Sequence, residues 1–202
     1  PGIPFAPVET YPVNRGFDKH YGVIWGVIDY FDPFSLVDGT EPVENLPDNY
    51  YFTKEINKKS VEYVKEMSKS DKPFFLYFAH CAPHWPLHAL PEDIQKYKDM
   101  YSDGWEKMRT NRYERQLEMG LVDNETFKLP ALMDRGKNWD DQSAKEKAYQ
   151  TKKMQVHAAM IDRIDQGIGD LVQTLRDTGQ FENTVIFFLC DNGASPEILR
   201  KP

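Results

Sequence analysis

The stretch Thr184–Gly193, Thr-Val-Ile-Phe-Phe-Leu-Cys-Asp-Asn-Gly, decides the fold class that the sequence predicts. Its central run, Val185–Cys190, is wholly apolar, rich in β-branched and aromatic residues and too short for a helix, so we expect a strand buried on both faces. Asp191 and Asn192 follow directly, and in open α/β sheets ligands bind beyond the carboxyl ends of the strands. These two oxygen donors predict a hard-cation site for Ca²⁺ or Mg²⁺, although Asp-Asn-Gly is also typical of a simple turn.

A second apolar run, Pro73–Ala79, ends in a loop that is rich in histidine and proline. Prolines on both sides of His84 restrict its backbone, which favours a histidine preorganised to meet an anion or to transfer a proton. For His80 and His88 in the same loop we prefer a simpler interpretation, in which the rings are solvated on the surface. We expect Pro73–Ala79 and Val185–Cys190 to be parallel strands of one sheet with helices on both faces.

Apolar residues at helical spacing predict the helices that flank these strands. The first expected helix starts at Thr53 as N-cap, and the second runs from Pro91 to about Met100. A third lies around Glu106–Met119. The fourth extends from about Ala144 to Thr178, with Gly179 as C-cap. In the last helix, Asp165 lies on the apolar stripe between Ile161 and Ile168. Because a buried carboxylate needs partners, we expect Asp165 to tie this helix to a neighbouring loop rather than to bind the metal.

Composition excludes some classes of function. The 202 residues can bury a sizeable core and are most simply one domain or part of one. The net charge of −7, from 25 Lys and Arg against 32 Asp and Glu without a basic cluster, argues against a nucleic-acid partner. No apolar run reaches the ~18 residues of a membrane span. The two cysteines, Cys81 and Cys190, make no disulfide framework.

Several of these motifs together resemble the sulfatase family. The apolar run at 73–78 followed by Ala-Pro-His-Trp-Pro at 82–86 is similar to the histidine loop of the sulfatases. Residues 161–169 followed by 187–193 resemble the segment that carries their last two metal ligands. Further matches occur in the same order as in the family, with Arg-Gly-Phe-Asp and Tyr-Gly within 15–22 and Tyr-Tyr-Phe-Thr at 50–53.

The resemblance implies an alkaline-phosphatase-like α/β fold, a three-layer sandwich with a mostly parallel central sheet that this chain leaves incomplete at both ends. Residues 1–202 would be part of a single catalytic domain, with a helical, hydrophilic insertion at about 92–150. Sulfatases hydrolyse sulfate esters with a formylglycine nucleophile at a Ca²⁺ site, in periplasmic, extracellular or lysosomal compartments. By resemblance, Asp191 and Asn192 are metal ligands, and His84 binds the substrate and acts in catalysis at the sulfate or bridging oxygen. The implied partner is a sulfated small molecule or glycan.

Other motifs of the family are not matched. Where the nucleophile motif Cys/Ser-x-Pro-Ser-Arg has serine and arginine, the stretch starting at Cys81 has His84 and Trp85. We therefore expect an internal piece of a sulfatase, with formylglycine present in the full-length enzyme but not in this chain. Alone, the chain should be inactive and bind Ca²⁺ no better than millimolar. Two alternatives are a related phosphoester hydrolase and a degenerate domain that binds a sulfated glycan without catalysis.

Overall fold

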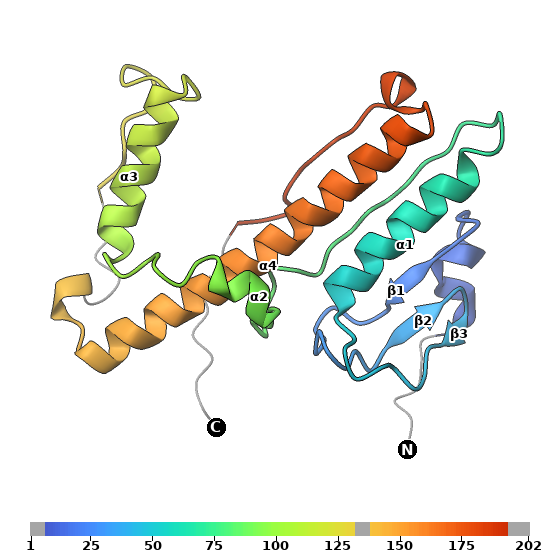
Figure 1. Ribbon diagram of the computed structural model, residues 1–202, viewed down its shortest axis with the longest axis horizontal. Helices are drawn as coiled ribbons and strands as arrows, with labels where there is room; N and C mark the ends of the chain where they lie inside the picture. The colour runs from blue at the N-terminus through green and yellow to red at the C-terminus, as the bar shows by residue number, and fades with distance from the viewer. Residues whose placement is uncertain (1–6, 132–137, 194–202) are drawn as a thin grey trace.

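Figure 1 shows the computed structural model, which describes residues 7–131 and 138–193. The N-terminal part is a small antiparallel sheet in the order β1-β2-β3, lying beside a pair of long helices. Its strands are β1 (Tyr21–Val23), β2 (Leu36–Asp38) and β3 (Glu41–Pro42), preceded by the 3-10 turns η1 (Val8–Thr10) and η2 (Pro12–Asn14). Tyr21 lies opposite Asp38, and Gly39 takes a positive φ of 65° in the tight turn between β2 and β3. The dipeptide Asp38-Gly39 is a typical turn signal in a sequence, and the structure has the turn there.

Helices make up most of the remaining regular structure. They are α1 (Phe52–Met67), α2 (Pro91–Gln95), α3 (Trp105–Glu118) and α4 (Ala144–Asp177), with the 3-10 turns η3 (Trp139–Asp141) and η4 (Phe181–Asn183). In Figure 1, α1 and α4 run side by side, and α3 stands near the N-terminal end of α4, away from the sheet. Among the described residues, no helix has the length and apolar character needed to cross a membrane.

Both ends of α4 follow local signals. Ser143 forms a capping box with Glu146, in which each side chain bonds the backbone N–H of the other. At the C-terminal end Gly179 has a φ of 70°, and the N–H of Gln180 donates to the carbonyl of Leu175 at 2.8 Å. This is a Schellman motif, so the predicted glycine C-cap is confirmed.

Two other helix boundaries differ from those expected. Helix α1 begins at Phe52, and Thr53 lies buried in the first turn instead of capping it. Because Phe52 packs into the core, the helix begins one residue before Thr53, although Thr53 has the better side chain for an N-cap. Helix α2 does start at Pro91 as predicted, but it ends at Gln95 and not near Met100.

Helices α1 and α4 approach each other closely at Asn57 and Gly167. The amide nitrogen of Asn57 donates to the backbone carbonyl of Arg163 at 2.9 Å. A Cβ added at Gly167 would lie only 2.1 Å from the Cγ of Asn57, so this position accepts only a glycine without rearrangement. The two helices therefore pack almost backbone to backbone here.

Asp165 does not lie on this buried face, and the expectation that it does is wrong. Each helical residue turns about 100°, so Asp165, two residues before Gly167, points about 160° away from the contact with α1. Its side chain is exposed. The neighbours Asp162 and Arg163 link α4 to α2 instead, through Lys96 and Asp93.

The core joins segments that are far apart in the sequence. It packs the loop between β1 and β2, the start of α1, the histidine-bearing loop and the middle of α4 around nine buried residues: Ile28, Tyr30, Leu36, Tyr50, Tyr51, Phe52, Ile56, Ala82 and Met160. The histidine-bearing loop is therefore built into the core and is not an appendage of it.

The two predicted parallel strands form no ladder among the described residues. Pro73–Ala79 is extended, and its exposure alternates: Phe75 and Tyr77 are 74% and 72% exposed, whereas the residues on either side of each are half-buried. Val185–Cys190 is exposed throughout, so the prediction that both its faces are buried is wrong. Neither segment has a ladder partner in the described ranges. Figure 1 shows both segments running back in the same direction from the far ends of α1 and α4.

Helix α3, within the region predicted to be an insertion, has few contacts with the rest of the chain. No residue of α3 is buried, and its main support is Trp105, whose ring meets the ring of Trp139 edge-on with centroids 5.0 Å apart. Gly104 sits against the same Trp139, where a Cβ would lie 2.3 Å from the ring. The boundaries 92–150 remain a prediction, since part of this range lies outside the described residues.

Replacing Gly167 with alanine should lower the free energy of unfolding by about 1–3 kcal/mol, because the new methyl group forces Asn57 off its hydrogen bond. The matched control is Gly169→Ala in the same helix, where a Cβ would meet nothing within 4 Å. That control should be neutral or stabilising by up to ~1 kcal/mol. Urea unfolding monitored by circular dichroism measures both, and equal effects would contradict the close packing.

Candidate functional site

Two buried tyrosine hydroxyls hold the histidine loop, which we define as residues 80–90. The hydroxyl of Tyr30 donates to the backbone carbonyl of His84 at 3.0 Å, and that of Tyr51 donates to the carbonyl of His88 at 2.9 Å. Both tyrosines are 1% exposed. Burial raises the pKa of each phenol, so both stay protonated and remain donors at physiological pH.

The ring of His84 is exposed and has a defined tautomer. Its Nδ1 lies 2.7 Å from the carbonyl oxygen of Trp85. Because a carbonyl only accepts, Nδ1 must carry the proton, which leaves Nε2 free to face a ligand. The flanking Pro83 and Pro86 both follow cis peptide bonds. The structure thus presents His84 as a preorganised, solvent-facing imidazole.

The other two histidines of the loop are more enclosed than expected. Both ring nitrogens of His80 are buried without a hydrogen-bond partner, and the ring stacks on Phe78 with centroids 4.4 Å apart. His88 packs against the rings of Tyr30 and Phe31. The interpretation of both as solvated histidines is therefore wrong, because the loop is part of the core.

Asp191 and Asn192 are exposed at the end of the extended segment that follows η4. The amide of Asn192 makes one long hydrogen bond, to the carbonyl of Gly193 at 3.4 Å. In residues 7–131 and 138–193, no group of three or more His, Cys, Asp or Glu side chains is arranged to hold a metal ion. The two predicted ligands thus remain a pair of oxygen donors, and no hydrogen bond joins them to His84 within those ranges.

An ion pair that sequence reasoning missed lies at the end of the histidine loop. Asp93, in α2, is 1% exposed, and its carboxylate receives Nε and Nη2 of Arg163 at 2.7 and 2.6 Å. Gln166 and Lys96 donate to its other oxygen at 3.2 and 3.1 Å. Burial alone would raise the pKa of Asp93, but these hydrogen bonds outweigh it and hold the pKa below its usual value. Residues 161–169, which include Arg163, match a motif of the family, but nothing in the neighbouring sequence indicates a buried partner in α2.

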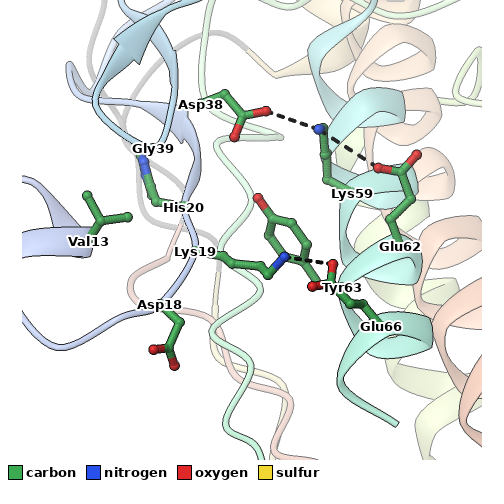
Figure 2. Close-up of a pocket in the computed structure, with 10 residues that line it drawn as sticks. All are labelled: Val13, Asp18, Lys19, His20, Asp38, Gly39, Lys59, Glu62, Tyr63 and Glu66. Carbon is green, nitrogen blue, oxygen red and sulfur yellow. Dashed lines mark hydrogen bonds and ion pairs between the residues drawn. The ribbon is translucent and has the colours of Figure 1, made fainter. Parts of the chain in front are cut away.

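A charged cleft of about 350 Å³ lies elsewhere, between the sheet and α1 (Figure 2). Lys19 pairs with Glu66 at 2.6 Å, and Lys59 pairs with Asp38 at 3.1 Å across it. None of the predicted site residues lines it. Its ion pairs connect the sheet to the helix, so the cleft is best explained as a structural junction.

The comparisons with known proteins give the class of the chain. The Sulfatase family model matches residues 4–200, and the chain belongs to the sulfatase family. It is 34% identical over 202 residues to an arylsulfatase of Klebsiella aerogenes, covering 95% of this chain and 43% of that protein. It is 30% identical over 206 residues to an uncharacterized sulfatase of Schizosaccharomyces pombe, covering 95% of this chain and 37% of the relative. The chain therefore spans about two fifths of the length of these relatives.

Solved structures agree on the fold. The crystal structure of Ps i-CgsB in complex with k-i-k-neocarrahexaose superposes with a TM-score of 0.55 at 22% identity, covering 87% of this chain and 32% of that one. The structure without the oligosaccharide gives the same values. Family and neighbours together confirm the alkaline-phosphatase-like α/β fold class, of which the described residues show the helices and a small sheet.

His80 should make the folded chain sensitive to acid. Burial lowers the pKa of His80 to about 4, whereas an unfolded histidine titrates near 6.5. On acidification the unfolded state takes up the proton first. The contribution of neutral His80 to the free energy of unfolding is therefore complete above pH ~6.5 and is lost between pH ~6.5 and ~4. This gap corresponds to roughly 3 kcal/mol at most. Burial also lowers the pKa of His20 and His157, which act with the same sign.

The variant His80→Leu should reduce this loss, and the exposed His84→Asn should not. Free energies of unfolding measured by urea titration at a series of pH values test the difference. An unchanged pH profile in His80→Leu would show that His80 does not titrate in this range.

Proposed function

We propose that the full-length protein carrying this chain is a sulfuric ester hydrolase of the arylsulfatase type. The observation that supports this most is the geometry of His84 in a chain of the sulfatase family. Its exposed ring bonds the carbonyl of Trp85 through Nδ1 and leaves Nε2 free, while Tyr30 holds its backbone carbonyl. Hydrolysis of a sulfate ester needs charge stabilisation on the sulfate oxygens and a proton for the departing alcohol. In this proposal His84 supplies the second.

In this proposal His84 acts while protonated. With Nδ1–H donating to Trp85, uptake of a proton at Nε2 gives a ring that can donate to the sulfate or to the bridging oxygen. The fixed backbone keeps the ring from turning away, since its carbonyl is held by Tyr30 and its N–H donates to the carbonyl of Cys81 at 3.0 Å. His84 thus combines substrate binding with proton donation.

Asp191 and Asn192 are the proposed ligands of a Ca²⁺ ion, with Mg²⁺ as the other hard cation that suits them. Their chemistry fits, because both present oxygen atoms and both side chains are exposed. A bound Ca²⁺ would supply positive charge to the sulfate oxygens. Because Ca²⁺ takes about six to eight oxygens, the remaining ligands must come from outside this pair.

The proposed substrate is a sulfated small molecule or glycan. The neighbouring Ps i-CgsB structure was solved with k-i-k-neocarrahexaose, an observation on that protein which favours an oligosaccharide here. By family resemblance, the nucleophile is expected in the full-length protein as formylglycine. This chain itself contains no Cys/Ser-x-Pro-Ser-Arg motif.

The test uses the full-length protein and a chromogenic aryl sulfate. We expect His84→Ala to lower kcat by about 10²–10⁴-fold, as for the loss of a proton-transfer group, and Asp191→Ala to weaken Ca²⁺ dependence. His88→Ala should affect mainly stability, because its ring packs against those of Tyr30 and Phe31. Hydrolysis of an aryl phosphate but not of the sulfate would favour a phosphoester hydrolase. Glycan binding without turnover would favour a non-catalytic domain.

The 202-residue chain alone should behave differently from the full-length protein. It should show no aryl sulfate turnover above that of an Asp191→Ala/His84→Ala double variant, because it lacks the nucleophile motif. Calorimetry should give Ca²⁺ affinity no better than millimolar, since two side chains leave the ion most of its water. Micromolar binding would reveal further ligands within the chain.

A further inference from the structure

We propose that Asp93 and Arg163 are positioning residues for His84, because their buried ion pair fastens the end of the histidine loop to α4. We call this pair, with Lys96, Asp162 and Gln166, the loop clamp. The role of His84 itself rests on the proposed function, but the effect of the clamp on its position does not.

The clamp is a closed network of hydrogen bonds. Arg163 grips one oxygen of Asp93 with two nitrogens, and the other oxygen receives Lys96 and Gln166. Lys96 and Gln166 in turn both contact the carboxylate of Asp162, at 2.5 and 2.8 Å. Every polar group that faces Asp93 is therefore paired, as a carboxylate with 1% exposure requires.

The short helix α2 needs this network to stay in place. It has only five residues, far below the length at which a helix is stable by itself, and Asp93 is its only buried residue. Its remaining contacts are with α4. Without the pair, the end of the histidine loop would keep the Tyr51 bond to the carbonyl of His88 and its packing against the core, but it would lose its buried ionic link to α4.

The clamp also ties the loop to the helix that leads to the candidate metal ligands. Arg163 lies in α4, which continues through η4 into the segment ending in Asp191 and Asn192. One buried contact therefore links the two parts of the proposed site. Loss of the pair should leave the chain folded around its core while the His84 ring loses its fixed orientation.

The experiment measures the tautomer of His84 in the 202-residue chain. Nuclear magnetic resonance of the ring nitrogens, at a pH where the ring is neutral, should show two well separated ¹⁵N shifts with Nδ1 protonated. In Asp93→Asn and Arg163→Met we expect the two shifts to move toward each other, because the ring then samples both tautomers. Arg163→Lys keeps the charge but loses the two-nitrogen grip, so it should lie between. The His84→Gln variant assigns the signals.

Controls separate positioning from general stability. Glu66→Gln removes the exposed ion pair with Lys19 and should leave the His84 signals unchanged. The signals of His157, within α4, should stay the same in every variant. Unaltered His84 shifts in all clamp variants that fold would overturn the proposal. If the shifts of His157 collapse as well, the pair is a general stability element and the proposal also fails.

Kinetics in the full-length protein give a second, independent readout. Asp93→Asn should lower kcat on the order of tenfold to a hundredfold with little change in KM, as expected when a proton donor is misplaced by about 1 Å. A rise in KM alone would contradict a positioning role. If the wild-type enzyme lacks sulfatase activity, the proposed function fails, and the resonance measurement still decides the inference.

Discussion

Two phenol hydroxyls, on Tyr30 and Tyr51, hold the carbonyl groups of a loop that would otherwise have none of the regular partners of a strand or helix. Each hydroxyl is buried, so leaving either it or its carbonyl unpaired would cost about 1–3 kcal/mol. The tyrosines come from the β1–β2 loop and from the residue just before α1, and their rings lie 6.2 Å apart. The core, the start of α1 and the exposed His84 are therefore parts of one arrangement. A change that moves α1 also moves the histidine that the proposed chemistry needs.

Charge is distributed unevenly around this core. The exposed ion pairs of the cleft, such as Lys19 with Glu66, lie in solvent and contribute little to stability. The pair of Asp93 with Arg163 differs, because Asp93 is almost fully enclosed and removal of Arg163 would leave its buried charge only partly compensated. The chain thus uses buried charge where α2, at the end of the histidine loop, meets α4. This is where a fixed geometry matters more than a gain in stability.

Features with a local cause could be predicted from the sequence, and features that depend on distant partners could not. The Gly179 cap, Pro91 at the start of α2 and the turn at Gly39 follow from backbone preferences that act within a few residues. The family motifs gave the fold class, which the family match confirms. Thr53 and Asp165 were misplaced because the start of α1 and the face of α4 are set by packing between helices. His84 could be proposed as a site residue from its motif, whereas Asp93 has no motif and depends on a partner 70 residues away.

The two extended apolar segments have a consequence for handling the chain in solution. Phe75, Tyr77 and the run Val185–Leu189 combine exposed side chains with backbone that has no ladder partner among the described residues. Such edges are templates for intermolecular β-pairing, and short windows of this composition form cross-β aggregates. Charged residues and proline flank them, with Asp71, Lys72 and Pro73 before the first and Asp191 after the second. By their charge and their position, these flanking residues are suited to act as gatekeepers that limit such pairing.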